Sequence, residues 1–244
     1  MKKTSLFVLF LTILSTGCKS LTVQQKQYTT TIQKVVLGSV GQDENYILKK
    51  TYSSLAVPDY NKPIKVSATP ILFNKTSLKR FKNAQKLQAK EVQVNYIDSL
   101  MLKPKFLNLQ TVDDVALIAL LNNNTNADIK NYLINKNNAH IVTSISIAFN
   151  ENTMQDILKA EEVFLESAGL KSIALNLYNN KALVKSIHFN EGVVFAYRVS
   201  QFCWKENSKH QLEIVNLIEG ITSCAKKTYK SAKRAKKEIN YYKL

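Results

Sequence analysis

Alternating apolar and polar residues between positions 162 and 218 constrain this chain more than any other feature. Ile173, Leu175 and Leu177 share one face of an extended segment, and the same spacing recurs after Asn179-Asn180 and after Gly192. Antiparallel strands joined by short turns bury one face and leave the other in water. The pattern therefore predicts an α+β fold, in which an antiparallel β-meander is covered by helices.

Several segments upstream predict those helices and further strands. Apolar stripes that follow polar capping residues predict a helical hairpin over 111–133, with its break at residues 122–124. Shorter helices are expected over 77–90 and 152–160. Strands are expected over 92–96 and 141–149, where every second residue is apolar.

The end of the chain predicts a basic amphipathic helix from Thr222 to Tyr242. Its alanine-rich stripe is expected to pack on the meander, and its lysines to face outward. The alternative is a helix whose basic face lies on anionic lipid or cell wall. Either arrangement gives a basic surface of Lys226, Lys227, Lys230, Lys233, Arg234 and Lys237.

The first residues have the layout of an export signal. Lys2 and Lys3 precede an apolar run over 6–14, and small residues lead to Cys18. The run is shorter than the roughly 20 residues that a permanent membrane-spanning helix needs. This segment is therefore expected to direct export.

The Gly17-Cys18 end resembles the lipobox of bacterial lipoprotein precursors, although Leu14 lies four residues before the cysteine and Ser15 occupies the usual leucine position. The resemblance covers residues 1–18 and implies a cut before Cys18, followed by attachment of a diacylglycerol, which carries fatty chains such as palmitate, to its sulfur. Lys19 in place of aspartate implies the outer membrane, with the protein on its inner leaflet facing the periplasm. An ordinary secretory signal is the alternative.

These features divide the chain into a signal peptide over 1–17, a lipid anchor and polar tether over 18–45, and a single α+β domain over 46–244. A strand from Tyr28 to Leu37 is expected within the tether. Residues 46–75 are expected to be irregular, because Pro58, Pro63 and Pro70 interrupt them.

The net charge of +16 is concentrated in two stretches. Residues 60–90 carry eight basic and no acidic residues, and residues 221–244 carry eight basic residues and one glutamate. An exported protein rarely meets nucleic acid, so no nucleic-acid partner is expected. The remaining partners are the membrane, an envelope protein complex and an anionic envelope polymer.

Few residues indicate chemistry. Cys203 and Cys224 are expected to form a disulfide, as paired cysteines in exported chains commonly do. The alternatives are two buried thiols, or a reactive Cys224 served by His188 or His210. The three histidines, which include His140, have no metal-ligand spacing, and no metal or cofactor is expected.

Ser99 lies in Asp98-Ser99-Leu100, which resembles the short O-glycosylation motif of some exported bacterial proteins. The sequence as a whole favours a non-enzymatic binding or structural component of the cell envelope. The alternatives are a small periplasmic hydrolase or thiol enzyme using Cys224, and a lipid or lipoprotein carrier with a groove over the sheet.

Overall fold

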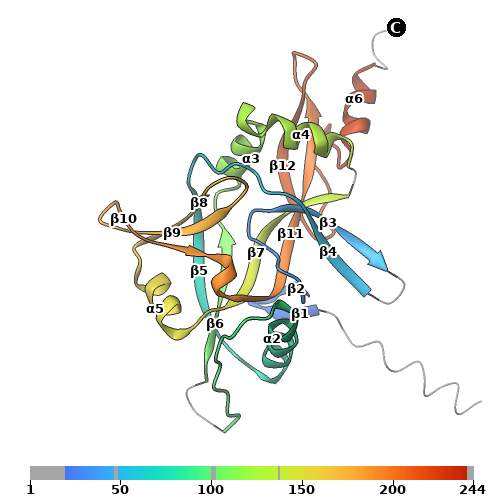
Figure 1. Cartoon of the computed structure of the whole chain (residues 1–244). Helices are drawn as coiled ribbons and strands as arrows, with labels where there is room; N and C mark the ends of the chain where they lie inside the picture. Colours follow the sequence, from blue (N-terminus) through green and yellow to red (C-terminus); the bar gives the residue numbers. More distant parts are fainter. Residues whose placement is uncertain (1–19, 47–48, 100–102, 137, 241–244) are drawn as a thin grey trace, which may run out of the picture.

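One strand, β7 (Ala139–Ala148), lies at the centre of an α+β fold (Figure 1). The computed structural model describes residues 20–46, 49–99, 103–136 and 138–240. All ten residues of β7 are buried. It pairs antiparallel with β11 (Val193–Glu206), β6 (Lys105–Thr111) and β3 (Val40–Tyr46). A strand buried on both faces needs a cover on each side, and the remaining elements supply the two covers.

Twelve antiparallel strands lie within the described residues. The longest path through them runs β1-β2-β11-β7-β6-β5-β8-β9-β10, while β12 pairs with β11 and β4 pairs with β3. The other strands are β1 (Ser20–Val23), β2 (Lys26–Thr30), β4 (Lys49–Ala56), β5 (Ile64–Leu72), β8 (Glu162–Ser167), β9 (Ile173–Asn179), β10 (Ala182–His188) and β12 (Leu212–Glu219).

The larger of two apolar clusters covers one face of β7. Ile145 and Ile147 of β7 pack in it together with Leu165 of β8 and Leu175 of β9. Strand β5 makes this possible, because its first two residues pair with β8 and the rest pairs with β6. The β8–β10 segment therefore turns across the central strands and closes over their apolar face.

Three helices complete this cover: α3 (Asp114–Asn122), α4 (Ala127–Ile134) and α5 (Glu151–Lys159). The Asn122 side chain fixes α3 to β12, since it donates to the Ile214 carbonyl at 2.7 Å and accepts from the Ile214 N–H at 3.1 Å. Met154 and Ile157 of α5 are buried in the same cluster. The predicted helical hairpin and the predicted helix over 152–160 are thus present.

The smaller cluster covers the opposite face of the sheet near its lower end in Figure 1. Helix α2 (Lys75–Gln88) contributes Phe81 and Ala84, and β1 contributes Leu21 and Val23. Phe195 of β11 lies among three other phenylalanine rings, with centroid distances of 5.0 to 6.2 Å. Asn74 begins the helix, because its side chain accepts from the Ser77 N–H at 2.8 Å.

The stretch assigned to a polar tether instead belongs to the sheet. Residues 20–46 contain β1, β2 and β3, and Leu21, Val23 and Tyr28 are buried. Of these strands, β2 overlaps the strand expected from Tyr28 to Leu37, whereas the few apolar residues of β1 and β3 do not stand out among their polar neighbours. Residues 18 and 19 lie outside the described part.

The second half also differs from prediction in its connections. Strands β8, β9 and β10 form a meander, but β10 ends at His188 and β11 pairs with β7, β2 and β12. The predicted continuous meander is therefore two separate units. The 3₁₀ turn over Phe189–Glu191 redirects the chain between them.

Three further expectations were wrong. The last helix, α6 (Ala232–Asn240), begins ten residues later than the expected start at Thr222, and residues 241 and 242 lie outside the described part. Residues 92–96 do not form a strand. Residues 46–75, expected to be irregular, contain β4 and β5. Strand β5 accommodates Pro70 because β8 pairs only with Ile64 and Lys65, which leaves the missing N–H of Pro70 on an unpaired edge.

We expect Phe195→Ala to lower the free energy of unfolding by about 3 to 5 kcal/mol, because it leaves a cavity among three rings. Denaturant unfolding measures this loss. Leu183→Ala, at a side chain that is 52% exposed, is the control and should change stability by less than about 0.5 kcal/mol. Equal stability of the two variants would contradict the assigned core.

Candidate functional site

A groove lies beside α4 in the described part of the chain. Its volume is about 560 Å³, within the usual range for ligand and peptide sites. We call it the α4 groove. Three segments form its walls: the end of β4 with the residues that follow it, helix α4, and the turn between β8 and β9. The lining residues are Leu55, Ala56, Val57, Pro58, Asp59, Thr125, Asn126, Asp128, Ile129, Tyr132, Ser167, Gly169, Leu170, Lys171 and Ser172.

A buried asparagine holds these walls in place. The Asn126 side-chain oxygen accepts from the Asp59 N–H at 2.8 Å, and its amide donates to the carbonyls of Asp59 and Leu120 at 3.1 Å each. The Ser167 hydroxyl donates to Asp59 Oδ1 at 2.7 Å and accepts from the Tyr60 N–H at 2.8 Å. The walls are therefore fixed by the fold and present a preformed surface.

The rim of the α4 groove combines apolar and charged side chains. Leu170 is fully exposed, and Tyr132 is 44% exposed. The turn that carries Leu170 begins at Gly169, whose φ of +121° favours glycine. Asp59, Asp128 and Lys171 are exposed at the rim, which therefore has one more negative than positive charge. An apolar segment that bears a positive charge fits this surface.

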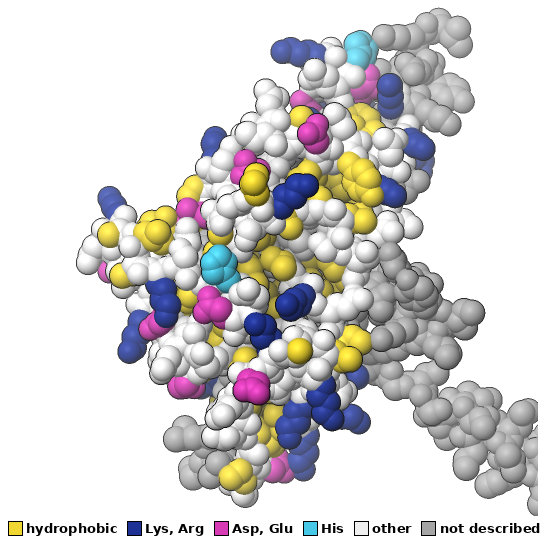
Figure 2. All heavy atoms as spheres, in the orientation of Figure 1, with side chains coloured by type: hydrophobic (Ala, Val, Ile, Leu, Met, Phe, Trp, Pro, Cys, Tyr) yellow, Lys and Arg dark blue, Asp and Glu magenta, His cyan; other side chains and the backbone are white. Residues whose placement is uncertain are grey.

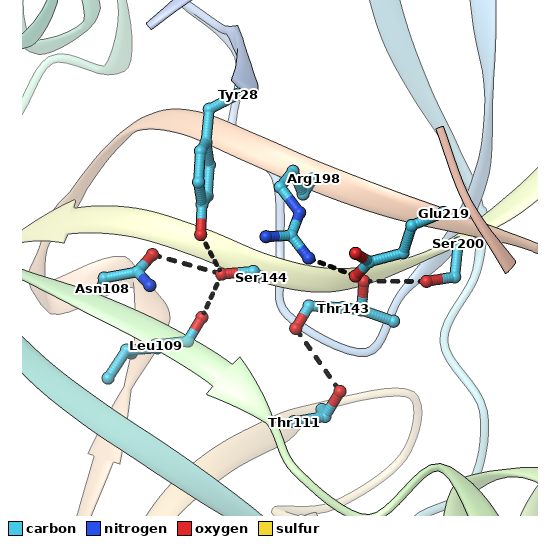
Figure 3. Close-up of polar contacts among 9 residues, drawn as sticks. All are labelled: Tyr28, Asn108, Leu109, Thr111, Thr143, Ser144, Arg198, Ser200 and Glu219. Carbon is cyan, nitrogen blue, oxygen red and sulfur yellow. Dashed lines mark hydrogen bonds and ion pairs between the residues drawn. The ribbon is translucent and has the colours of Figure 1, made fainter. Parts of the chain in front are cut away.

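Polar side chains also meet inside the sheet (Figure 3). The Ser144 hydroxyl lies within hydrogen-bond distance of the Tyr28 hydroxyl at 2.9 Å, Asn108 Oδ1 at 3.2 Å and the Leu109 carbonyl at 2.9 Å. Farther along, Thr143 and Ser200 share a hydrogen bond of 3.1 Å. These groups satisfy one another between strands, so their role is to hold the sheet.

Arg198 lies beside this polar row. Its guanidinium pairs with Glu219 and lies 5.3 Å from the centre of the Tyr28 ring (Figure 3). Arg198 is buried, whereas Glu219 is partly exposed. The pair and the ring offset part of the cost of burying the charge, while the second terminal nitrogen of Arg198, Nη1, is buried without a hydrogen-bond partner among the described residues.

The two predicted disulfide partners are bonded in the structure. Cys203 lies in β11 and is buried, and its sulfur is joined to that of Cys224 with a Cα–Cα distance of 5.7 Å. Cys224 does not open a helix, because α6 begins eight residues later at Ala232. The bond instead fixes the irregular segment after β12, which is also paired to β11 through the backbone of Trp204 and Tyr229.

The three histidines lie in different parts of the fold. His140 is the second residue of β7, with Nε2 at 4.0 Å from Asp43 Oδ2. His188 ends β10, and His210 lies in the β11–β12 turn, with Nδ1 at 2.7 Å from Glu206. Tyr197 donates to Asp43 at 3.0 Å, and burial together with this carboxylate raises the pKa of Tyr197. Among the described residues, no three His, Cys, Asp or Glu side chains form a metal-binding group.

Ser99 is exposed, next to an ion-paired aspartate. Asp98 pairs with Lys75 at 2.8 Å and accepts from the Tyr96 hydroxyl at 2.9 Å, and these two contacts hold the pKa of Asp98 below its ordinary value. Leu100 lies outside the described residues. Glycosylation of Ser99 stays a prediction.

The predicted C-terminal basic surface is exposed in part. Lys226, Lys227, Lys230, Lys233 and Arg234 are exposed, and the guanidinium of Arg234 lies 5.3 Å from the Tyr229 ring centre. Ala232 and Ala235 of α6 are buried against the sheet. The side chain of Lys237, like all of Cys18, lies outside the described part.

A comparison with models of protein families found none that matches this chain, and a search of curated proteins found no matching sequence. Within the described residues, no helix has the length and apolar character needed to cross a membrane.

Sequence reasoning missed the α4 groove. Its walls come from residues 55–59, 125–132 and 167–172, which are far apart in the chain. One local signal was present: Asn126 follows a run of asparagines that was interpreted only as a break between helices.

We expect the double substitution Cys203→Ala and Cys224→Ala to lower stability by about 3 kcal/mol, since the bond closes a loop with a sequence separation of 21. Reductant should lower the melting temperature of the wild type to that of the double variant and leave the variant unchanged. A wild type whose melting is insensitive to full reduction would contradict this role of the bond.

Proposed function

We propose that this chain is a lipoprotein, held to a membrane by lipid on Cys18, whose folded part faces the periplasm and binds a partner. Its role is that of a non-enzymatic component of the cell envelope. One observation carries the proposal: Cys18 lies two residues before β1, so a cut ahead of it leaves every described strand and helix intact. The position of the lipobox-like residues and the start of the described fold thus agree.

The Cys203–Cys224 bond supports the same compartment. Structural disulfides persist in oxidising compartments such as the periplasm and are rare in the cytosol. The bond also bears on the enzyme alternative, because a Cys224 sulfur bonded to Cys203 has no thiolate to act as a nucleophile. A thiol enzyme is therefore disfavoured.

Lys19 supports the outer membrane as the site of anchoring, with the folded part on the periplasmic side of its inner leaflet. This choice depends on the resemblance to lipoprotein precursors, in which aspartate after the cysteine favours the inner membrane.

The α4 groove is the surface that we assign to partner binding. Its apolar walls and the carboxylates of Asp59 and Asp128 suit an apolar segment of an envelope protein that bears a lysine or arginine. Because the walls are already fixed, binding a partner costs less conformational entropy than binding to a flexible surface would. Carriage of a lipid is the second candidate, favoured by the volume of about 560 Å³ and the apolar side chains that line it.

We expect radiolabelled palmitate fed to cells to label the wild-type protein and not the Cys18→Ser variant, because the serine hydroxyl lacks the sulfur to which the lipid is attached. The variant that lacks Cys203 and Cys224 is the matched control and should keep its label. Label in the Cys18→Ser variant, or none in the wild type, would exclude the anchor.

A second experiment tests the groove. Leu170→Asp places a charge on its apolar rim, and the protein recovered with the wild type from detergent-solubilised membranes should be lost. Ile221→Asp is the control, since Ile221 is as exposed as Leu170, at 102% against 101%, and lies in the turn after β12. Mass spectrometry identifies the recovered protein. Equal recovery by both variants would place the partner elsewhere.

A further inference from the structure

Helix α2 carries a single row of lysines on its outer side. Lys75, Lys79, Lys82 and Lys86 follow one another at spacings of four, three and four residues, which aligns them on one face of a helix. All four are exposed. The opposite face holds Ser77, Phe81, Ala84 and Gln88, all buried. We call the four residues the α2 lysine row.

The row lacks compensating charge on its own helix. Residues 75–88 contain no Asp or Glu, and like charges three or four residues apart repel one another. Lys75 pairs with Asp98 at 2.8 Å, whereas Lys79, Lys82 and Lys86 make no ion pair with a described residue. Figure 2 shows lysine and arginine side chains gathered over α2, at the lower end of the molecule. An anionic surface is the complement of such a row.

The chain enters the fold beside this helix. Leu21 and Val23 of β1 belong to the same buried cluster as Phe81 and Ala84 of α2, and Figure 1 draws β1 next to α2. Ser20 lies two residues after Cys18, and that length of chain spans at most about 7 Å. A lipid on Cys18 therefore brings β1, and α2 with it, close to the surface of the bilayer.

We propose that the α2 lysine row lies on the anionic phospholipid headgroups of the membrane that holds the Cys18 lipid. This inference rests on the proposed lipid anchor and adds an orientation to it: α2 faces the membrane. The C-terminal basic residues lie near α6, at the opposite end of the molecule in Figure 1, and stay in water.

The α4 groove then faces away from the bilayer. Helix α4 is drawn at the upper end of Figure 1, far from α2. A domain held by a short link and by a charged face has a restricted orientation, so the groove is presented to partners across the periplasm. A long tether would leave the orientation free.

Lysine labelling tests the contact. Lipidated protein, purified in detergent, is placed in vesicles of phosphatidylcholine alone or of phosphatidylcholine with phosphatidylglycerol, since neither lipid has a primary amine. After flotation of the vesicles, a brief pulse of an amine-reactive ester is read out by peptide mass spectrometry. We expect labelling of Lys79, Lys82 and Lys86 to fall about fivefold on the anionic vesicles, the factor for one lysine near an anionic surface. Molar salt should restore the labelling.

Two matched variants distinguish an effect of the α2 lysine row from an effect of the protein's net charge, because each removes three lysines. In one, Lys79, Lys82 and Lys86 are changed to Gln; in the other, Lys226, Lys230 and Lys233 are changed to Gln. Lys75 remains in both and reports the contact. Its protection by anionic vesicles should be lost in the first variant and kept in the second.

The outcomes distinguish this inference from the proposed function. Protein that floats with neither vesicle overturns the lipid anchor. Protein that floats with both, but whose row is labelled equally on the two, overturns the membrane contact of α2 and leaves the anchor standing. Protection of Lys226 and Lys230 in place of the row would assign the membrane face to the C-terminal residues and overturn this inference as well.

Discussion

The burial of β7 on both faces is the constraint on which the rest of the structure depends. All ten of its residues are buried, so the chain must supply two covers. Strands β8 to β10 and helices α3 to α5 cover one face with apolar side chains. The other face carries Ser144 and Ser146, and Tyr28 and Asn108 supply partners to Ser144. Buried polar side chains restrict how the strands can pack, because each one needs its hydrogen-bond partner at a fixed position.

The second cover connects the fold to the proposed function. It uses the first described strand, β1, and the most basic helix, α2. Because β1 is needed to bury that face, the chain has almost no length to spare between the fold and Cys18. A segment predicted to be a tether therefore contains a structural strand, β1. The charged helix α2 packs against this strand and so lies beside the proposed anchor. The same packing that stabilises the domain would orient it on a membrane.

Local patterns predicted much of the fold. The helices near 77–90 and 152–160, the hairpin over 111–133 and the strand over 141–149 are present, because capping residues and periodicity act within one segment. The predictions were wrong where contacts between residues far apart in the chain determine the local structure. The short strands within 18–45 depend on β11, and the Cys203–Cys224 bond holds residues that a helix over 222–242 would have included. The α4 groove required three segments at once, so composition gave no sign of it.

The mass of the amino-terminal peptide of the native protein tests the central claim most directly. The account predicts that this peptide, taken from protein extracted from membranes, begins at Cys18 and carries the added mass of a diacylglycerol and its fatty chains. A peptide that begins at Met1, or one that begins at another residue and carries an unmodified Cys18, would contradict the account. The basic residues of α2 would then need a partner other than the membrane.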